Sequence, residues 1–263
     1  MHDRAVRESG HDTTYRLDGR CAHLCTVDLN SLLYRYERDL ARFLEMFSVP
    51  GESAADWSQR AEDRKAAMNK WLWNEQSGQF FDWNFVKEEA VIYDSATAFW
   101  TLWAEVASPT QADALIDALL PKLEMPGGVV SGTEQSRGSI SLERPSRQWD
   151  FPYGWAPHQI MIWQGLLRYG RGETARRLAY RWLFTILNAY SNYNGVVPEK
   201  FDVVTGSHRV DVEYGNVGTD FKMVAREGFA WMNASFMVGL EILGIRERRA
   251  LGALIPPELL YKK

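Results

Sequence analysis

The sequence predicts an all-α protein built from repeated helical hairpins, arranged either as an α-solenoid or as a closed double ring of helices. Two observations lead to this prediction. Apolar residues recur at helical spacing through most of the chain, whereas convincing strand alternation is scarce. Long loops alternate regularly with helix pairs, and the loop tips 78–82 and 195–202 resemble each other. Since about seven or eight helices are expected, too few for a full ring, we expect an incomplete ring in this chain.

The expected helices follow from the spacing of apolar residues and from start and stop signals. They cover 27–47, 53–73, 93–106, 109–121, 156–169, 172–191 and 228–243. Ser53 and Asp94 stand near expected N-termini, and Pro109 occupies a favourable first helical position. Gly51 and Gly170 follow expected C-termini.

The first of these helices has the clearest pattern. Its apolar residues follow the i, i+3, i+4, i+7 spacing that places side chains on one face of a helix. They are Leu29, Leu32, Leu33, Tyr36, Leu40, Phe43, Leu44 and Phe47. The segment is therefore predicted to be an amphipathic helix.

Between the expected helices lie long segments rich in glycine, polar and aromatic residues. They cover 1–22, 74–93, 124–155 and 192–227. Loops of this length are uncommon in a compact domain unless they are functional, so we expect the functional residues there. Within these segments, 129–131 and 196–197 are expected to form at most short extended pieces.

Composition excludes some classes of protein and favours others. The net charge of −4 gives no basic surface for nucleic acid. No secretory signal, transit peptide or membrane-spanning run is evident, so we expect a cytoplasmic protein without a membrane partner. At 46% hydrophobic residues the chain can bury a sizeable core. Aromatic residues make up 13% of the chain, and they either fill this core or line a sugar site.

The two cysteines, Cys21 and Cys25, are four positions apart. On a helix they would share a face without suiting a disulfide, and no set of Cys and His accompanies them to bind zinc. We therefore expect a pair of small, buried, reduced side chains.

Hydrolysis of a glycosidic bond with inversion needs a carboxylic acid and a carboxylate about 6.5–9.5 Å apart. The best candidates are carboxylates on the long loops rich in glycine, polar and aromatic residues. Asp12 lies in the segment 7–16, where Gly10 permits a close backbone approach or a positive φ. Hydroxyl groups and Arg16 are placed to orient Asp12 and a sugar. The alternative is that Asp12 only forms a turn or a helix cap.

Three further segments carry candidate groups. Residues 148–157 combine aromatic residues, prolines and a glycine before a helix, which predicts either a rigid binding surface or a structural plug. Residues 198–202 and the segment beginning at 213 supply carboxylates. Spacing alone leaves the base open among five residues, namely Glu199, Asp202, Glu213, Asp220 and Glu227.

The sequence predicts no metal site. It has no H-x-x-x-H set, and His158 at the start of a helix is expected to be a packed or capping residue. The tract 205–220 has several oxygen-bearing side chains but lacks the spacing of an EF-hand calcium loop.

Taken together, these segments resemble the trehalase family, and the fungal neutral type most of all. Residues 148–157, Gln-Trp-Asp-Phe-Pro-Tyr-Gly-Trp-Ala-Pro, resemble a highly specific signature of the family. Residues 7–16 resemble the segment with the general acid, and 199–203 resemble the segment with the general base. Glu213-Tyr214, followed by 228–231, resembles the closing motifs, with Ala230 where the family commonly has glycine.

The resemblance implies an (α/α)6 toroid and inverting hydrolysis of α,α-trehalose to two glucose molecules, with no cofactor. It places the general acid at Asp12 and the general base at Glu199. It also implies that Gly10 and Glu213 contact the sugar and that Trp149 lines the site.

The resemblance spans nearly all of 1–263, which we expect to form the C-terminal portion of a single catalytic domain. The family's first signature and its substrate-binding arginines have no counterpart in this sequence, nor do its regulatory segments. An alternative function is therefore a non-catalytic sugar-binding or regulatory fragment that pairs with another polypeptide. Another alternative is a toroid that acts on a different sugar. In each case an incomplete ring should expose apolar faces and lead to marginal stability or association.

Overall fold

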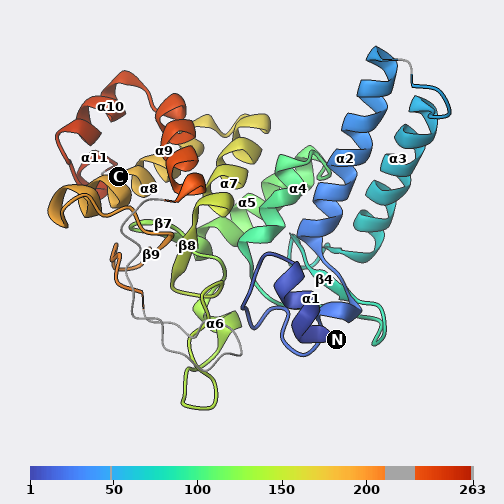
Figure 1. Ribbon diagram of the computed structural model, residues 1–263, viewed down its shortest axis with the longest axis horizontal. Coiled ribbons are helices and arrows are strands. Elements are labelled where there is room, and N and C mark those ends of the chain that lie inside the picture. The colour runs from blue at the N-terminus through green and yellow to red at the C-terminus, as the bar shows by residue number, and fades with distance from the viewer. Residues whose placement is uncertain (48, 211–228, 262–263) are drawn as a thin grey trace.

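Helices dominate the computed structural model, which describes residues 1–47, 49–210 and 229–261 (Figure 1). This confirms the predicted fold class. The longer helices are α1 His2–Glu8, α2 Val27–Met46, α3 Ala54–Trp71, α5 Pro109–Leu123, α7 Ala156–Arg168, α8 Gly172–Asn192, α9 Ala230–Ile242 and α10 Ile245–Gly252. The short ones are η1 Cys21–His23, η2 Ala96–Phe99, α4 Trp100–Trp103, α6 Glu134–Arg137 and α11 Pro257–Leu260.

The longer helices from α2 onward form an arc that runs from the α2–α3 pair to α10 and α11 (Figure 1). At one end α2 packs against α3 and α4. The next contacts join α4 to α7, and α7 to both α8 and α9. At the other end α10 and α11 pack on α8. The arc is consistent with part of a helical ring.

Short strands decorate the connections between the helices, more of them than the sequence predicted. They are β1 Leu24–Cys25, β2 Trp73–Asn74, β3 Gln79–Phe80, β4 Asp82–Asn84, β5 Glu89–Val91, β6 Glu124–Met125, β7 Gly128–Val129, β8 Tyr153–Trp155 and β9 Lys200–Asp202. Hairpins β2–β3 and β6–β7 follow α3 and α5, while β8 pairs with the distant β9. They are too short to show an alternating pattern in the sequence.

Several element boundaries confirm the start signals, and others correct them. Ser53 caps α3, and α5 begins at Pro109 as predicted. The helix expected over 93–106 is shorter, because it starts as a 3-10 turn capped by Ser95 and ends at Trp103, although Asp94 does stand near its N-terminus. The N-terminal segment, expected to be a loop, contains α1 and η1.

The cysteine prediction was wrong for one residue. Cys21 is buried in η1, but Cys25 lies on β1 and is exposed. The two residues therefore share no helix face, because the chain changes from a 3-10 turn to a strand between them.

Apolar packing is densest along α7 and α8. The side chains of Trp163, Trp182 and Leu183 are fully buried there. Gly239 of α9 permits close packing on α8, because a Cβ atom at this position would lie 2.3 Å from a methyl group of Leu183. None of the helices in the described ranges is long and apolar enough to cross a membrane.

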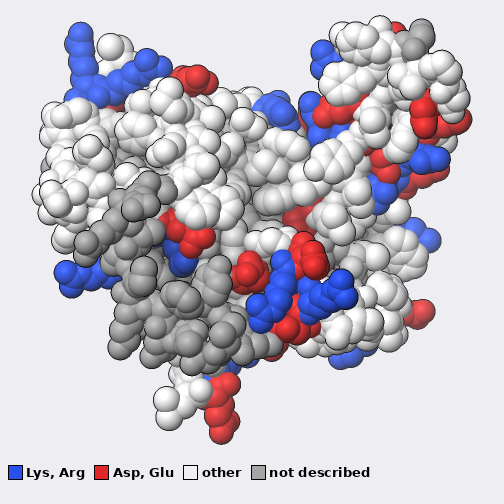
Figure 2. Space-filling model, in the orientation of Figure 1, with Lys and Arg blue, Asp and Glu red and all other residues white. Residues whose placement is uncertain are grey.

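The apolar face of α2 lies mostly in solvent. We call this surface the α2 stripe and define it by five exposed side chains, Leu29, Tyr36, Leu40, Phe43 and Phe47. Figure 2 shows the α2–α3 pair projecting from the molecule, with a notch between it and the other helices. The exposed apolar face expected of an incomplete ring is therefore present.

Candidate active site

The loop that carries Asp12 is anchored by a buried carboxylate, Asp150. Its Oδ1 accepts hydrogen bonds from the Thr14 hydroxyl at 2.6 Å and from the Tyr93 hydroxyl at 2.7 Å. Its Oδ2 accepts one from the backbone N–H of Tyr15 at 3.0 Å. Asp150 is fully buried. Its donors come from residues 7–16, which we call the acid loop after the predicted acid Asp12, and from the loop before η2. A buried carboxylate with all of these partners fixes the loop rather than taking part in chemistry.

Aromatic stacking supports the same loop from the side. Trp149 donates its backbone N–H to the carbonyl oxygen of Thr13 at 3.1 Å. Its ring stacks on Trp155, with centroids 3.9 Å apart, and meets His11 edge to face. Because Trp149 is only 6% exposed, little of its ring is open to a ligand. Contact between Trp149 and a sugar stays a prediction.

Arg16 does not orient Asp12 or a sugar, contrary to the interpretation of the sequence. It is buried between Asp28 and Asp82, and it donates to both carboxylates at 2.7–3.2 Å. The two carboxylates use the donors that a sugar would need. Arg16 therefore joins the acid loop to the start of α2 and to β4, below the site.

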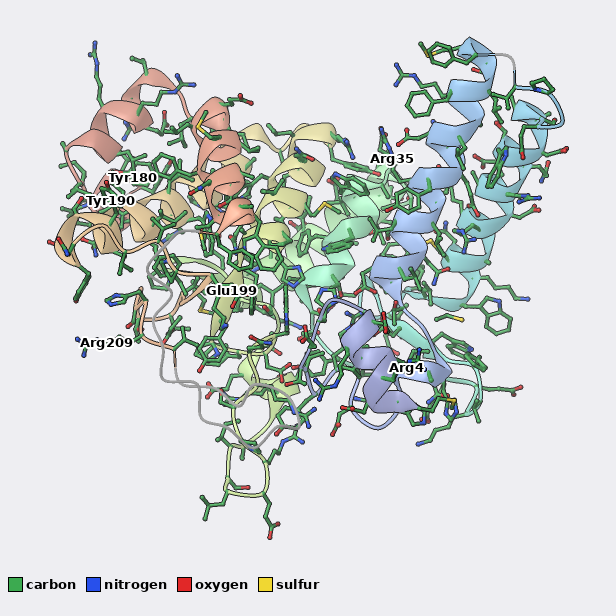
Figure 3. The ribbon with its side chains drawn as sticks, in the orientation of Figure 1. Arg4, Arg35, Tyr180, Tyr190, Glu199 and Arg209 are labelled. Carbon is green, nitrogen blue, oxygen red and sulfur yellow. The ribbon has the colours of Figure 1, made fainter. Side chains whose placement is uncertain are left out.

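Glu199 lies immediately before β9, with its side chain 24% exposed (Figure 3). One carboxylate oxygen accepts from Lys200 Nζ at 2.8 Å. Trp231 at the start of α9 donates its indole N–H to the Glu199 carbonyl at 3.3 Å. The pairing of β9 with β8 places Lys200 directly opposite Trp155. Strand register therefore sets the position of Glu199.

Asp12 and Glu199 are close enough to interact electrostatically. Burial raises the pKa of Asp12, and the negative charge of Glu199 raises it further. Arg7 and Lys200 act in the opposite direction without cancelling the rise. A carboxyl group with a raised pKa holds its proton to higher pH, which suits a general acid.

Of the other carboxylates considered as the general base, one lies in the described part of the structure and three do not. Asp202 accepts two backbone N–H bonds from the turn that follows it, at 2.9 and 3.1 Å, so it has a structural role. Glu213, Asp220 and Glu227 lie outside the described residues.

The remaining residues predicted for the site lie around the acid loop. Gly10 has φ +78° with open space around it, so its glycine is required by the backbone conformation rather than by crowding. His158 is buried and stacks on His11, which confirms a packed residue. Burial lowers the pKa of both imidazoles.

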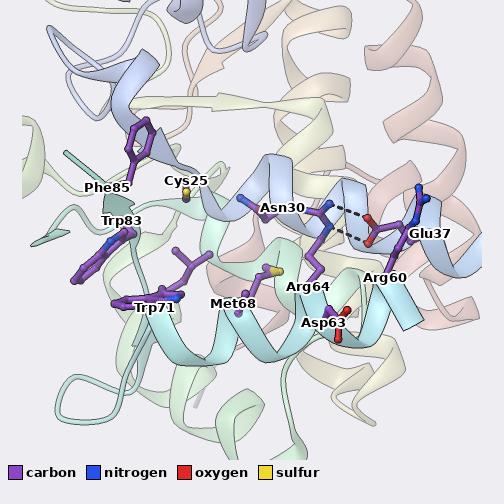
Figure 4. Close-up of a pocket in the computed structure, with 12 residues that line it drawn as sticks. Cys25, Asn30, Glu37, Arg60, Asp63, Arg64, Met68, Trp71, Trp83 and Phe85 are labelled. Carbon is purple, nitrogen blue, oxygen red and sulfur yellow. Dashed lines mark hydrogen bonds and ion pairs between the residues drawn. The ribbon is translucent and has the colours of Figure 1, made fainter. Parts of the chain in front are cut away.

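Metal binding and surface grooves are matters separate from the two carboxylates. Within the described ranges, no group of three or more His, Cys, Asp or Glu is arranged to hold a metal ion. A groove of about 690 Å³ between α2, α3 and β4 is lined by Trp71, Trp83 and the Arg64–Glu37 pair (Figure 4). It contains none of the predicted site residues.

Sequence reasoning missed the roles of three supporting residues, although all three lie in segments it had singled out. It did not foresee that Asp150 anchors the acid loop or that Gln148 contacts both halves of the site. It gave no role to Lys200, which follows Glu199 in the sequence. Their contacts run between distant parts of the chain, for example 136 residues from Gln148 to Asp12, and spacing cannot show them.

Comparisons with known proteins identify the family of this chain. The model of the trehalase family matches residues 1–244. The cytosolic neutral trehalase of Neurospora crassa is 55% identical over all of this chain, which covers 38% of that protein. The cytosolic neutral trehalase of Saccharomyces cerevisiae is 52% identical over 98% of this chain, which covers 36% of that protein. The chain thus spans less than half the length of these curated relatives.

Solved structures show the same fold. The neutral trehalase Nth1 from Saccharomyces cerevisiae matches 97% of this chain with a TM-score of 0.86 and 48% identity, and the match covers 44% of that protein. A mannosylglycerate hydrolase from Thermus thermophilus matches 83% of this chain with a TM-score of 0.62. At 20% identity, the second likeness shows the fold alone.

Proposed function

Since this chain belongs to the trehalase family, we propose that it contributes the two catalytic carboxyl groups for hydrolysis of α,α-trehalose to two glucose molecules. The proposal depends on one observation above all. Asp12 and Glu199 come from distant loops, yet they lie within electrostatic reach of each other and are linked by hydrogen bonds through Gln148 and Lys200.

The proposed reaction inverts the anomeric carbon. Asp12 gives its proton to the glycosidic oxygen as the bond from that oxygen to the anomeric carbon breaks. Glu199 takes a proton from the water whose oxygen attacks the same carbon from the opposite face. The products are two glucose molecules, and the carboxyl groups have exchanged their protonation states. The raised pKa of Asp12 supports its role as the acid.

Substrate contacts are proposed for three residues. The left-handed backbone at Gly10 leaves open space in front of the acid loop. Trp149 offers little of its ring, since it is only 6% exposed. Glu213 is proposed on its motif alone.

The setting of the reaction is part of the proposal. We place residues 1–263 in the later part of one catalytic domain, on the order of the motifs. The relatives are named cytosolic, which supports a cytoplasmic location.

The test is glucose release from trehalose by the purified chain and by Asp12→Asn and Glu199→Gln. Each change should reduce turnover by about 10²–10⁴-fold, the usual contribution of acid–base catalysis. Asp202→Asn is the matched control, because it changes a nearby carboxylate with a structural role. Proton NMR during the first minutes should show equal amounts of α- and β-glucose from the wild type. Unchanged turnover in both site variants would overturn the assignment, and faster cleavage of another glycoside in a substrate panel would overturn trehalose as the substrate.

The α2 stripe favours a second candidate function, pairing with another polypeptide without turnover. The five side chains are 40–61% exposed, and contiguous apolar patches of this kind mark interaction surfaces. In this case isothermal titration would detect trehalose binding, sedimentation would detect association, and glucose release would be absent. A monomer at all concentrations that binds no trehalose would exclude this function.

A further inference from the structure

One amide side chain touches both halves of the candidate site. Gln148 Nε2 donates to the backbone carbonyl oxygen of Asp12, and Gln148 Oε1 accepts from Lys200 Nζ at 3.0 Å. Lys200 Nζ donates in turn to Glu199 Oε2 at 2.8 Å. A continuous chain of three hydrogen bonds thus runs from the acid residue to the carboxylate of the base.

The orientation of this amide is fixed by its partners. An ammonium group has only donors, and a carbonyl oxygen only accepts. The amide oxygen must therefore face Lys200, and the amide nitrogen must face Asp12. A flipped amide would place two donors together and two acceptors together. Gln148 is also 2% exposed, so water offers it little alternative.

Lys200 is held as firmly as Gln148. Its Nζ lies 4.7 Å from the centroid of the Trp155 ring, in range for a cation–π contact. The strand pairing of β8 with β9 sets Trp155 opposite Lys200, and the Trp155 indole donates to the carbonyl oxygen of Gln148 at 2.7 Å. The ammonium has three donors, of which Gln148 and Glu199 take two.

From this geometry we propose that Gln148 and Lys200 form a positioning pair that sets the placement of the acid Asp12 relative to the base Glu199. The pair touches neither substrate nor water in the reaction. It acts by holding two loops from distant parts of the chain in fixed positions relative to each other. The roles of acid and base rest on the proposed function, but the coupling between the two loops does not.

The expected effect is on turnover, because a shift of about 1 Å in a catalytic group can cost about 100-fold in rate. Lys200→Met removes the ammonium and keeps a side chain of similar length. Gln148→Met removes both contacts of the amide, and Gln148→Glu keeps an acceptor for Lys200 but loses the donor to Asp12. Each should lower kcat by about 10–100-fold with little change in KM.

A double-mutant cycle separates a coupled pair from two independent residues. If Gln148 and Lys200 act as one unit, the double variant should lose about as much activity as either single variant. Multiplied losses would overturn the proposal. Lys122→Met is the matched control, since this lysine also donates to a carboxylate, Asp94, at 3.1 Å. Melting curves of all variants check that folding is retained.

A second measurement needs no turnover. Carbon-13 NMR follows the titration of the Asp12 carboxyl group in the wild type and in Lys200→Met. The charged groups that act on Asp12 are Arg7, Glu199 and Lys200, so loss of Lys200 should move the titration to higher pH. Identical titrations would overturn the proposal even if both proteins hydrolyse trehalose. If the wild type releases no glucose, the proposed function fails, and the titration still tests whether Lys200 lies close enough to Asp12 for the pair to act.

Discussion

Two long helices of similar length, α8 and α2, differ in how many polar side chains they bury. In α8 the buried face is apolar and includes Trp182 and Leu183. In α2 three of the six buried residues are polar or charged, namely Asp28, Ser31 and Glu37, while the α2 stripe is in solvent. The apolar pattern of a helix therefore shows which face needs a partner, but it does not show whether the described part of the chain supplies that partner.

Ion pairs add to the apolar contacts of Val27 and Tyr34 on the buried face of α2. Arg16 bridges Asp28 to β4, and Arg64 of α3 makes two hydrogen bonds to Glu37, at 2.8 and 2.7 Å. Ion pairs of this kind depend on geometry and on ionisation, whereas apolar packing depends on volume. Substitutions at the two ends of the arc should therefore change the free energy of unfolding by different amounts and with different dependence on pH.

The largest loss in the free energy of unfolding is expected from a substitution at the α8 end of the arc. Trp182→Ala removes a fully buried ring and its hydrogen bond to Ser235 at 2.9 Å. The free energy of unfolding should fall by about 3–5 kcal/mol, measured by urea denaturation. Trp57→Ala, at a partly exposed ring on α3, is the control and should cost much less. A loss below about 1 kcal/mol at Trp182 would show that α8 is not packed as described.

A smaller, pH-dependent effect is expected at the α2 end. Burial raises the pKa of Asp28, but Arg16 and His11 outweigh burial and hold this pKa well below its usual range. The stability that ionised Asp28 provides is therefore present above about pH 4 and is lost as the pH falls below that value. Asp28→Asn should cost about 1.5–3 kcal/mol at neutral pH, and the difference from the wild type should shrink in acid.

Urea denaturation at several pH values measures this difference. Asp113→Asn is the control, since Asp113 makes an exposed pair with Arg171. It should change stability by less than about 1 kcal/mol at any pH. A difference for Asp28→Asn that stays constant down to about pH 3 would contradict the role of its ionised form.

The smallest effect on stability is expected on the α2 stripe itself. Leu40→Gln with Phe43→Gln should change the free energy of unfolding by less than about 0.5 kcal/mol per site, because both side chains are already exposed. The same variant should weaken any self-association in sedimentation experiments. If the wild type is a monomer and the double variant is nevertheless much less stable, the α2 stripe is buried in solution.

The sequence was sufficient for the fold class and for most helix boundaries. Periodicity located α2, α3, α5, α7 and α8 to within a few residues, because long amphipathic helices repeat their pattern several times. The short strands repeat no pattern and escaped prediction. The motifs identified Asp12 and Glu199 as candidate catalytic residues. The sequence did not predict the partners of Arg16. Its contacts to Asp28 and Asp82 depend on how separate segments pack.

The chain of hydrogen bonds through Gln148 has a consequence for how the protein folds. It joins residues 136 and 52 positions apart, so the site cannot form until the chain has closed loops of that size. Helices need only local contacts and form far sooner. After dilution from denaturant, helical circular dichroism should therefore recover before the fluorescence of the stacked Trp149–Trp155 pair. A refolding protein would then regain most of its shape while its two carboxyl groups are still apart.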